Sequence, residues 1–265
     1  METKGRQTIS AIVITKDEAA KIKRCLESVK WVDEIIVVDD QSSDETIETC
    51  KPYAQKIIIQ KSEGNFDRQR NTGIDNASSD WILQLDADEV VTDRLRGAIE
   101  QALKSKTDLC GFYFKRKNYV LGKPLMHGGW YHNFLRLYRK SAGRYIGSSV
   151  HELVEVKGSI GYLDAEIEHF VVEDIDRFTA RQNYYTSAEA QRMLRERGQL
   201  TEKEIRYQMS IKPVKVFFKT YIKKKGFRDG THGLFYCAYN AYLHAIKWAK
   251  YWELICVKKN AAQQT

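Results

Sequence analysis

Four short, mostly apolar runs rich in valine and isoleucine constrain the fold more than any other feature of this chain. They occupy residues 10–15, 34–38, 56–60 and 81–85. Between the first three runs, segments 17–29 and 46–53 carry apolar residues at helical spacing. Runs that are apolar on both sides of a strand fit a sheet that helices cover on both faces. With right-handed crossovers, the order strand, helix, strand predicts a doubly wound, mostly parallel sheet of the Rossmann type, sandwiched by helices.

Acidic residues follow two of these predicted strands. Asp39 and Asp40 come at the end of the second run, and Asp86, Asp88 and Glu89 come directly after the fourth. Ligands of doubly wound sheets bind at the carboxyl ends of the strands. We therefore expect both acidic clusters to lie in one crevice.

Asp86 and Asp88 flank the small residue Ala87, and this spacing suits a metal bound to a diphosphate. In a strand or tight turn, residues i and i+2 project to the same side. Mg²⁺ and Mn²⁺ prefer oxygen ligands and keep positions open for phosphate oxygens. The alternative is an ordinary turn in which Asp88 or Glu89 caps the next helix. A carboxylate cluster after a buried strand is costly unless a cation or hydrogen-bond donors neutralise it, which favours the metal.

Two further residues are candidates for binding the nucleotide. Asp40 is placed to accept a hydrogen bond from an N–H group of a nucleobase or to bind ribose hydroxyls. The alternative is that this segment forms a turn or a helix cap. Arg70 belongs to the segment 68–71, which precedes the fourth strand and would bring guanidinium groups near the crevice. A solvated basic face is the alternative for this segment.

If the diphosphate belongs to an activated sugar, its transfer to a hydroxyl group also needs a general base. Adjacent His151 and Glu152 offer the best acid–base pair, with Glu152 as the base and His151 orienting it or touching the metal. A hydrogen-bonded structural pair is the alternative. His169 is a candidate further metal ligand, and its alternative is a core histidine whose hydrogen bonds are satisfied.

The pattern divides the chain into three segments. Residues 1–110 form the predicted nucleotide-sugar-binding half. Residues 111–175 contain short extended pieces at 112–114, 134–138 and 152–156 and form an acceptor-side region of the same catalytic domain. Residues 176–265 form a basic, helical C-terminal region whose first helix we expect Asp176 to cap.

Positive charge is concentrated near the C-terminus. Residues 177–259 hold 18 Lys and Arg against 6 Asp and Glu, although the whole chain carries only +8. Within them, residues 214–222 predict a basic amphipathic helix that packs on the catalytic body or lies on an anionic membrane surface. The five cysteines lack metal-ligand spacing, and neither a signal peptide nor a spanning segment is evident. We expect a cytoplasmic protein that binds the membrane peripherally.

The segments 12–15 (IVIT), 35–44 (IIVVDDQSSD) and 81–89 (WILQLDADE) together resemble family 2 glycosyltransferases with the GT-A fold. The resemblance extends through 68–71 (RQRN), 127–130 (HGGW), 136–138 (RLY), 150–152 (VHE) and 226–230 (GFRDG). This fuller set is similar to bacterial lipopolysaccharide inner-core β-1,4-glucosyltransferases, which are inverting enzymes that act on heptose.

The resemblance implies roles for individual residues. Asp40 would contact the nucleobase, Asp86 the ribose or diphosphate, and Asp88 the metal, while Glu152 would be the base. Thr15, in the first matching segment, would belong to the donor site. The implied donor is a UDP-sugar, above all UDP-glucose, with Mg²⁺ or Mn²⁺, and the implied acceptor is a lipid-linked or phosphorylated glycan.

Two other interpretations remain open at this stage. A transferase of the same fold would glycosylate a peptide side chain. A non-catalytic protein would bind anionic ligands, including nucleic acid through residues 177–206, but it would leave Asp86 and Asp88 unexplained. We therefore expect no nucleic-acid partner.

Overall fold

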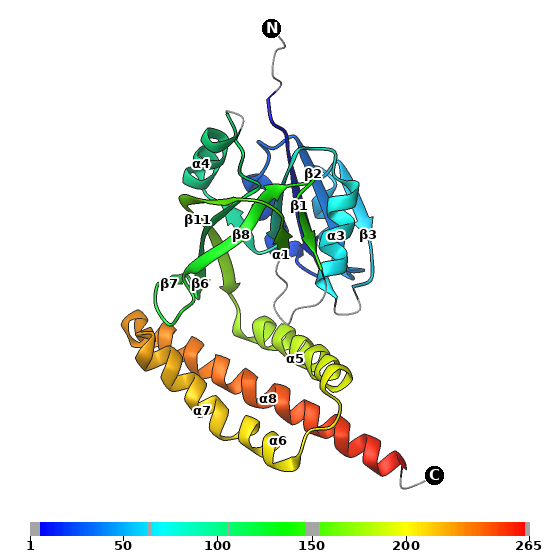
Figure 1. Cartoon of the computed structure of the whole chain (residues 1–265), viewed down its shortest axis with the longest axis vertical. Coiled ribbons are helices and arrows are strands. Elements are labelled where there is room, and N and C mark those ends of the chain that lie inside the picture. The colour runs from blue at the N-terminus through cyan, green and yellow to red at the C-terminus, as the bar shows by residue number, and fades with distance from the viewer. Residues whose placement is uncertain (1–5, 63–64, 105–106, 147–153, 263–265) are drawn as a thin grey trace. The chain divides into compact units, whose positions relative to one another are not determined.

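The four apolar runs form four neighbouring parallel strands (Figure 1). The computed structural model describes residues 6–62, 65–104, 107–146 and 154–262. Across the sheet the parallel strands follow the order β3 (Lys56–Ile59), β2 (Glu34–Asp39), β1 (Ile9–Thr15) and β4 (Trp81–Asp86). The predicted α/β fold class is confirmed, because the chain has a central sheet with helices on both faces.

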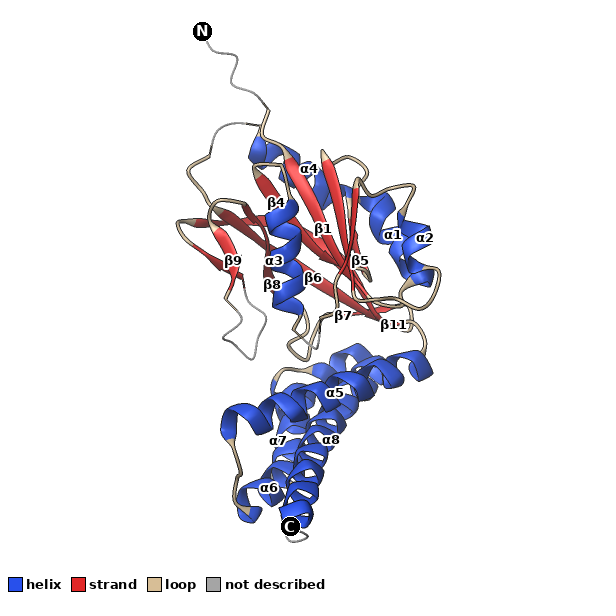
Figure 2. Ribbon diagram, turned by 90° about the vertical axis from the view of Figure 1, so that its right-hand side faces the viewer, coloured by secondary structure: helices blue, strands red, loops and turns tan. Residues whose placement is uncertain are grey.

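Strand β1 shows why these runs are apolar throughout. Its residues Ala11 and Val13 belong to a core that also contains buried side chains of α1 (Ala19–Ser28) and α4 (Asp93–Leu103). Ile12 and Ile14 belong to the core on the other face, which also contains Ile74 of α3 (Phe66–Asn76). Figure 2 shows α3 on this face of the sheet. A side chain at Gly73 of α3 would lie 2.3 Å from the Cγ2 atom of Ile12, so glycine permits this close packing. The short helix α2 (Thr46–Cys50) follows β2.

The rest of the sheet is largely antiparallel, and sequence analysis recognised it only in part. Next to β4 come β8 (His132–Arg139), β6 (Gly111–Val120), β11 (Ile160–Val172) and β5 (Glu89–Val91), with β7 (Lys123–Leu125) paired to β6. A separate pair joins β9 (Gly143–Tyr145) to β10 (Val154–Val156). The long strand β11 was not predicted, because its charged residues interrupt the apolar pattern. Its antiparallel pairing with β5 sets His169 opposite Glu89.

Contacts divide the chain into two units. The first unit comprises Met1–Lys117 and His132–His169, and the second comprises Asn118–Tyr131 and Phe170–Thr265. The chain passes from one unit to the other within β6 and β11. The functional division into residues 1–110, 111–175 and 176–265 stays a prediction.

The second unit is mainly helical. Its helices are α5 (Ile175–Arg197), α6 (Glu202–Met209), α7 (Ile211–Phe218), the π-helical turn η1 (Lys219–Lys223), the 3₁₀ turn η2 (Gly226–Asp229) and α8 (Gly230–Ala262). The prediction that Asp176 caps α5 is wrong: Asp174 is the cap and accepts a hydrogen bond from the Arg177 backbone, whereas Asp176 lies in the first helical turn. Among the described residues, no helix is long and apolar enough to cross a bilayer.

Two segments that carried the family resemblance meet inside the second unit. The Nδ1 atom of His127 lies 2.8 Å from Asp229, which also accepts a hydrogen bond from the His127 backbone. The Gly128 backbone donates to the Lys224 carbonyl. These hydrogen bonds connect the turn after β7 to the turns before α8.

Candidate active site

The strand register brings three predicted site residues to one edge of the sheet. Thr15 at the end of β1 lies opposite Asp39 at the end of β2, and Ile14 lies opposite Asp86 at the end of β4. Asp40 follows directly and bonds through its backbone to the Thr15 carbonyl. The Thr15 hydroxyl is buried and has no hydrogen-bond partner among the described residues. The two acidic clusters therefore lie at the same edge of the sheet, at the ends of β2 and β4.

The two aspartates after β2 have different surroundings. Asp39 is fully buried and accepts hydrogen bonds from the backbone and hydroxyl of Ser42, which makes it the closing residue of a turn. The Asp40 carboxylate accepts two hydrogen bonds of 2.6 Å, from the backbone and hydroxyl of Ser62, and lies 3.6 Å from Lys16. Asp39 is thus structural, while Asp40 holds the segment after β3 at the sheet edge.

Three arginines surround Asp86. Arg70 of α3 lies 3.1 Å from one carboxylate oxygen, and Arg136 of β8 and Arg116 of β6 lie 2.8 and 3.7 Å from the other. Burial opposes ionisation of Asp86, but the arginines outweigh it and hold the pKa of this carboxyl well below its usual range. Asp86 is therefore a carboxylate whose oxygens are engaged by arginine from two sides.

Glu89 completes this cluster. The side chain is fully buried, accepts a 2.9 Å hydrogen bond from the Asp86 backbone, and lies 3.1 Å from the Nε atom of Arg116. The next helix, α4, is capped instead by Thr92, which accepts from the Leu95 backbone. The alternative in which Asp88 or Glu89 caps that helix is therefore wrong.

Asp88 points toward a different partner. Its Oδ1 atom lies 3.2 Å from the Nε2 atom of His169, and both side chains are largely buried. The same Nε2 atom lies 2.8 Å from a guanidinium nitrogen of Arg116. Arg116 and a cation at Asp88 would compete for the single lone pair of Nε2, so a metal at this position would replace the Arg116 contact of His169.

This pair fits a divalent metal. Adjacent ligands of an octahedral Mg²⁺ or Mn²⁺ with bonds of about 2.1 Å lie about 3.0 Å apart, close to the 3.2 Å between Asp88 and His169. Within the described residues, no group of three or more His, Cys, Asp and Glu side chains is arranged as a complete metal cage. Two protein ligands suit an ion that shares its remaining positions with water and phosphate oxygens.

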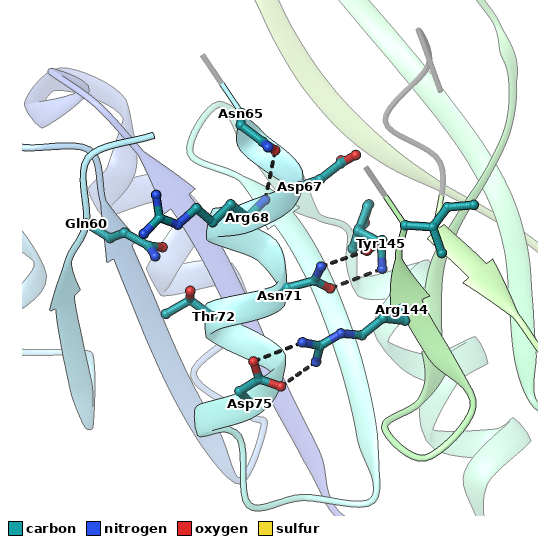
Figure 3. Close-up of a pocket in the computed structure, with 10 residues that line it drawn as sticks. Gln60, Asn65, Asp67, Arg68, Asn71, Thr72, Asp75, Arg144 and Tyr145 are labelled. Atoms are coloured by element: carbon teal, nitrogen blue, oxygen red, sulfur yellow. Dashed lines mark hydrogen bonds and ion pairs between the residues drawn. The ribbon is translucent and has the colours of Figure 1, made fainter. Parts of the chain in front are cut away.

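A polar cavity of about 360 Å³ lies along α3 in the same unit (Figure 3). Asn71 fixes one wall by exchanging two hydrogen bonds with the Tyr145 backbone, and Arg144 pairs with Asp75. The ring of Tyr145 also packs against Arg70, with 5.3 Å between the guanidinium carbon and the ring centroid. Tyr145 therefore lines the cavity and also contacts Arg70, which pairs with Asp86.

Sequence reasoning missed two residues of the site. Arg116 stands between Lys115 and Lys117, and such a run of basic residues is typical of a solvated surface. Arg136 lies between apolar residues of a predicted strand. A charged residue at such a position is unusual, and this was the sign in the sequence that Arg136 has a buried partner. The predicted acid–base pair His151 and Glu152 lies outside the described residues.

Comparisons with known proteins find a family and individual relatives for this chain. A sequence profile described as "Glycosyl transferase family 2" matches residues 10–154, which is more than half of the chain. An uncharacterized glycosyltransferase of Rickettsia felis is 27% identical, covering 96% of this chain and 93% of the relative. LpsC, a lipopolysaccharide core biosynthesis glycosyltransferase of Rhizobium meliloti, is 25% identical, covering 94% of this chain and 91% of the relative.

A solved structure shares the fold. The mannosyltransferase PcManGT from Pyrobaculum calidifontis, determined in complex with GDP-Man and Mn²⁺, superposes with a TM-score of 0.50 at 14% sequence identity. The match covers 98% of this chain and 81% of that protein.

Proposed function

Because this chain belongs to glycosyl transferase family 2, we propose that it moves glucose from UDP-glucose to a saccharide of the bacterial envelope, such as a heptose of the lipopolysaccharide core. Its similarity to LpsC, whose name places that relative in lipopolysaccharide core biosynthesis, supports the acceptor class. The complex of PcManGT with GDP-Man and Mn²⁺ supports a nucleotide-sugar donor and a divalent metal.

The observation that carries the proposal is the convergence of Asp88 and His169 beside the arginine-bound Asp86. Asp88 and His169 would hold Mg²⁺ or Mn²⁺. When bound, the metal neutralises negative charge that develops on the departing diphosphate. The predicted ligand pair thus has the chemistry and spacing that the reaction needs.

The arginines supply the second part of the donor site. Arg70, Arg116 and Arg136 bring three positive charges to the carboxylates of Asp86 and Glu89 and, 3.8 Å from Arg70, to that of Asp67. Guanidinium groups match phosphate oxygens geometrically. In our proposal Asp86 orients these arginines toward the diphosphate.

The nucleoside end has its own candidate residues. Thr15 offers a buried hydroxyl that no described residue bonds, and Asp40 stands two strands away from the metal pair at the same edge. The polar cavity beside α3 begins at Gln60, which follows β3. We assign the base and ribose to this end of the crevice.

Inversion at the anomeric carbon requires a base that takes the proton of the acceptor hydroxyl. We assign this role to Glu152, with His151 beside it in the chain. A lipid-linked or phosphorylated glycan acceptor would place the enzyme on the cytoplasmic face of the membrane. Peptide acceptors belong in the same acceptor screen as heptose-containing glycans, because only product analysis separates these two classes.

The test is UDP release from a panel of UDP-sugars with Mn²⁺ or Mg²⁺. We expect release from one UDP-sugar, dependent on metal, and a loss of about a thousandfold in Asp88→Asn, since Lewis-acid stabilisation contributes several kcal/mol. Asp93→Asn is the matched control, because Asp93 is an exposed carboxylate in the first turn of α4. Equal activity of the two variants, or release that persists in excess chelator, would remove the metal from the proposal.

A further inference from the structure

An apolar stripe runs along the outward face of α7 and η1. It consists of Ile211, Val214, Phe218 and Ile222, which recur at helical spacing and are 50%, 54%, 57% and 52% exposed. We call these four residues the α7 stripe. Large exposed apolar residues scattered singly are normal on protein surfaces, but four in one row mark an interaction site.

The packing of α7 does not account for this stripe. The helix buries its opposite side, where Pro213 and Thr220 are almost inaccessible, and it lies beside α8 within the second unit (Figure 1). Phe217 and Tyr221 stack on each other with 5.1 Å between ring centroids and are half-buried at the edge of the stripe. The stripe is therefore a second apolar face, additional to the one that holds the helix in its unit.

A row of lysines accompanies the stripe. Every stripe residue is followed directly by a lysine, so that a positive row lies along one flank; these lysines are Lys212, Lys215, Lys219 and Lys223. With Lys224 and Lys225, residues 211–226 contain six lysines and no acidic residue. Within the described part of the chain, no ion pair involves Lys219 or Lys223. The charge of this flank is thus available to an anionic partner.

We propose that the α7 stripe and its lysine row dock into the headgroup layer of an anionic bilayer. The apolar side chains would enter the boundary of the acyl chains, the lysines would contact anionic headgroups, and Tyr221 would lie at the interface. This proposal rests on the proposed function in one respect, namely that the acceptor lies in a membrane. The docking surface itself is inferred from the exposure and charge of its residues alone.

Most aromatic residues of α8 do not compete for this role, although Tyr242 and Trp252 are 50% and 47% exposed. Trp248 and Tyr251 are buried in the core formed with α5 and α6, and Tyr236 and Tyr239 pack against the core around Phe178. Helix α8 thus mainly packs, whereas α7, which sequence analysis left between packing and lipid, presents an exposed apolar face. A second copy of the chain fits the stripe less well, because two copies facing each other would bring their lysine rows together.

Vesicle sedimentation tests the proposal with the full-length protein. Vesicles of phosphatidylcholine alone are compared with vesicles that also contain phosphatidylglycerol. Wild-type protein should sediment with the anionic vesicles and release from them as salt is raised. Phe218→Glu should weaken binding about thirtyfold, since a buried phenylalanine contributes about 2 kcal/mol. Lys219→Gln with Lys223→Gln should also weaken it about thirtyfold at low salt, since each lysine contributes about 1 kcal/mol.

The matched control is Val257→Glu, an equally exposed apolar residue in the same unit, on α8. It should bind vesicles like the wild type. No sedimentation of wild-type protein with anionic vesicles would overturn the proposal, as would equal losses in the control and stripe variants. Light scattering identifies the rival occupant: a dimer that Phe218→Glu converts to a monomer would assign the stripe to a second copy.

Thermal melting and UDP release on the same preparations separate this proposal from the catalytic one. A stripe variant that melts normally and releases UDP in solution, yet fails to bind vesicles, supports the docking surface. Loss of UDP release in every sample with intact vesicle binding would instead contradict the proposed reaction and leave the docking surface in place.

Discussion

The sheet edge of the first unit and the α7 face of the second unit use charge in opposite ways. At the sheet edge, Asp86, Glu89, Arg70 and Arg136 are largely buried and contact one another at 2.8 to 3.9 Å. On α7, the lysines are mostly exposed and the apolar residues beside them are exposed as well.

This difference separates two kinds of function. Buried charges must be paired, and their geometry is then fixed by the fold, as a reaction centre requires. Exposed charges are screened and mobile, and they act through their sum rather than through individual positions. We therefore expect a single charge substitution to cause a large loss of stability or activity at the sheet edge. A single charge substitution on the helical unit should have a small effect.

The largest stability effect should come from Arg136→Ala. It removes the 2.8 Å partner of Asp86 and leaves a buried carboxylate with less compensation, so the free energy of unfolding should fall by about 3 kcal/mol. Urea denaturation of the purified protein measures it. Arg206→Ala in the second unit is the control, because its pair with Glu202 is more than 70% exposed on both sides and should contribute less than about 1 kcal/mol. Similar losses in both variants would erase the contrast between the two regions.

A smaller effect should follow from His169→Ala. Removal of one of two protein ligands should raise the Mn²⁺ concentration for half-maximal UDP release by about tenfold to a hundredfold, while saturating metal restores much of the rate. A metal titration of the rate measures this shift. His244→Ala is a suitable control, since His244 contacts Gln208 in the second unit. An unchanged metal dependence would show that His169 serves only Arg116.

The smallest expected effect concerns the pH dependence of stability. It involves Glu34 at the start of β2, at the opposite end of this strand from the candidate site. Burial would raise the pKa of Glu34, but hydrogen bonds from Ser10, Ser78 and Lys56 lower it to about 2. The pKa in the unfolded chain is higher, so this stabilisation is present above about pH 5 and is lost as the pH falls toward 2.

The stability difference between wild type and Glu34→Gln should therefore shrink, by an amount on the order of 1 kcal/mol, between pH 5 and pH 2. Urea midpoints across that range measure it. Glu48→Gln, in an exposed pair with Lys51, should show no such trend. A difference that stays constant with pH would mean that Glu34 acts through packing alone.

The parallel half of the fold could be predicted from sequence because each of its strands is apolar on both faces. The antiparallel half was harder, since β11 alternates charged with apolar residues and its pairing with β5 joins distant parts of the chain. Helix starts were also uncertain: Asp174 and Asp176 are equally good caps by composition, and only backbone geometry selects Asp174.

The site follows the same division. Asp40, Asp86 and Asp88 were predictable because they end or follow recognisable strands. Their partners were not, because Ser62, Arg116 and Arg136 reach them only through tertiary contacts. The contact between Asp88 and His169 brings together two predicted ligands, but their role as ligands stays a prediction, as does catalysis by Glu152.

The pairing of β5 with β11 also bears on how such a chain can change during evolution. Asp88 precedes β5 and His169 lies within β11, opposite Glu89, so the register of these two strands decides whether the two side chains meet. A one-residue slip would turn His169 to the other face of the sheet. Insertions in the loops of the long connection between these strands, outside the strands β6 and β8 that carry Arg116 and Arg136, leave that register intact. Those loops can therefore diversify in length and sequence, while a single insertion inside β11 would separate the pair.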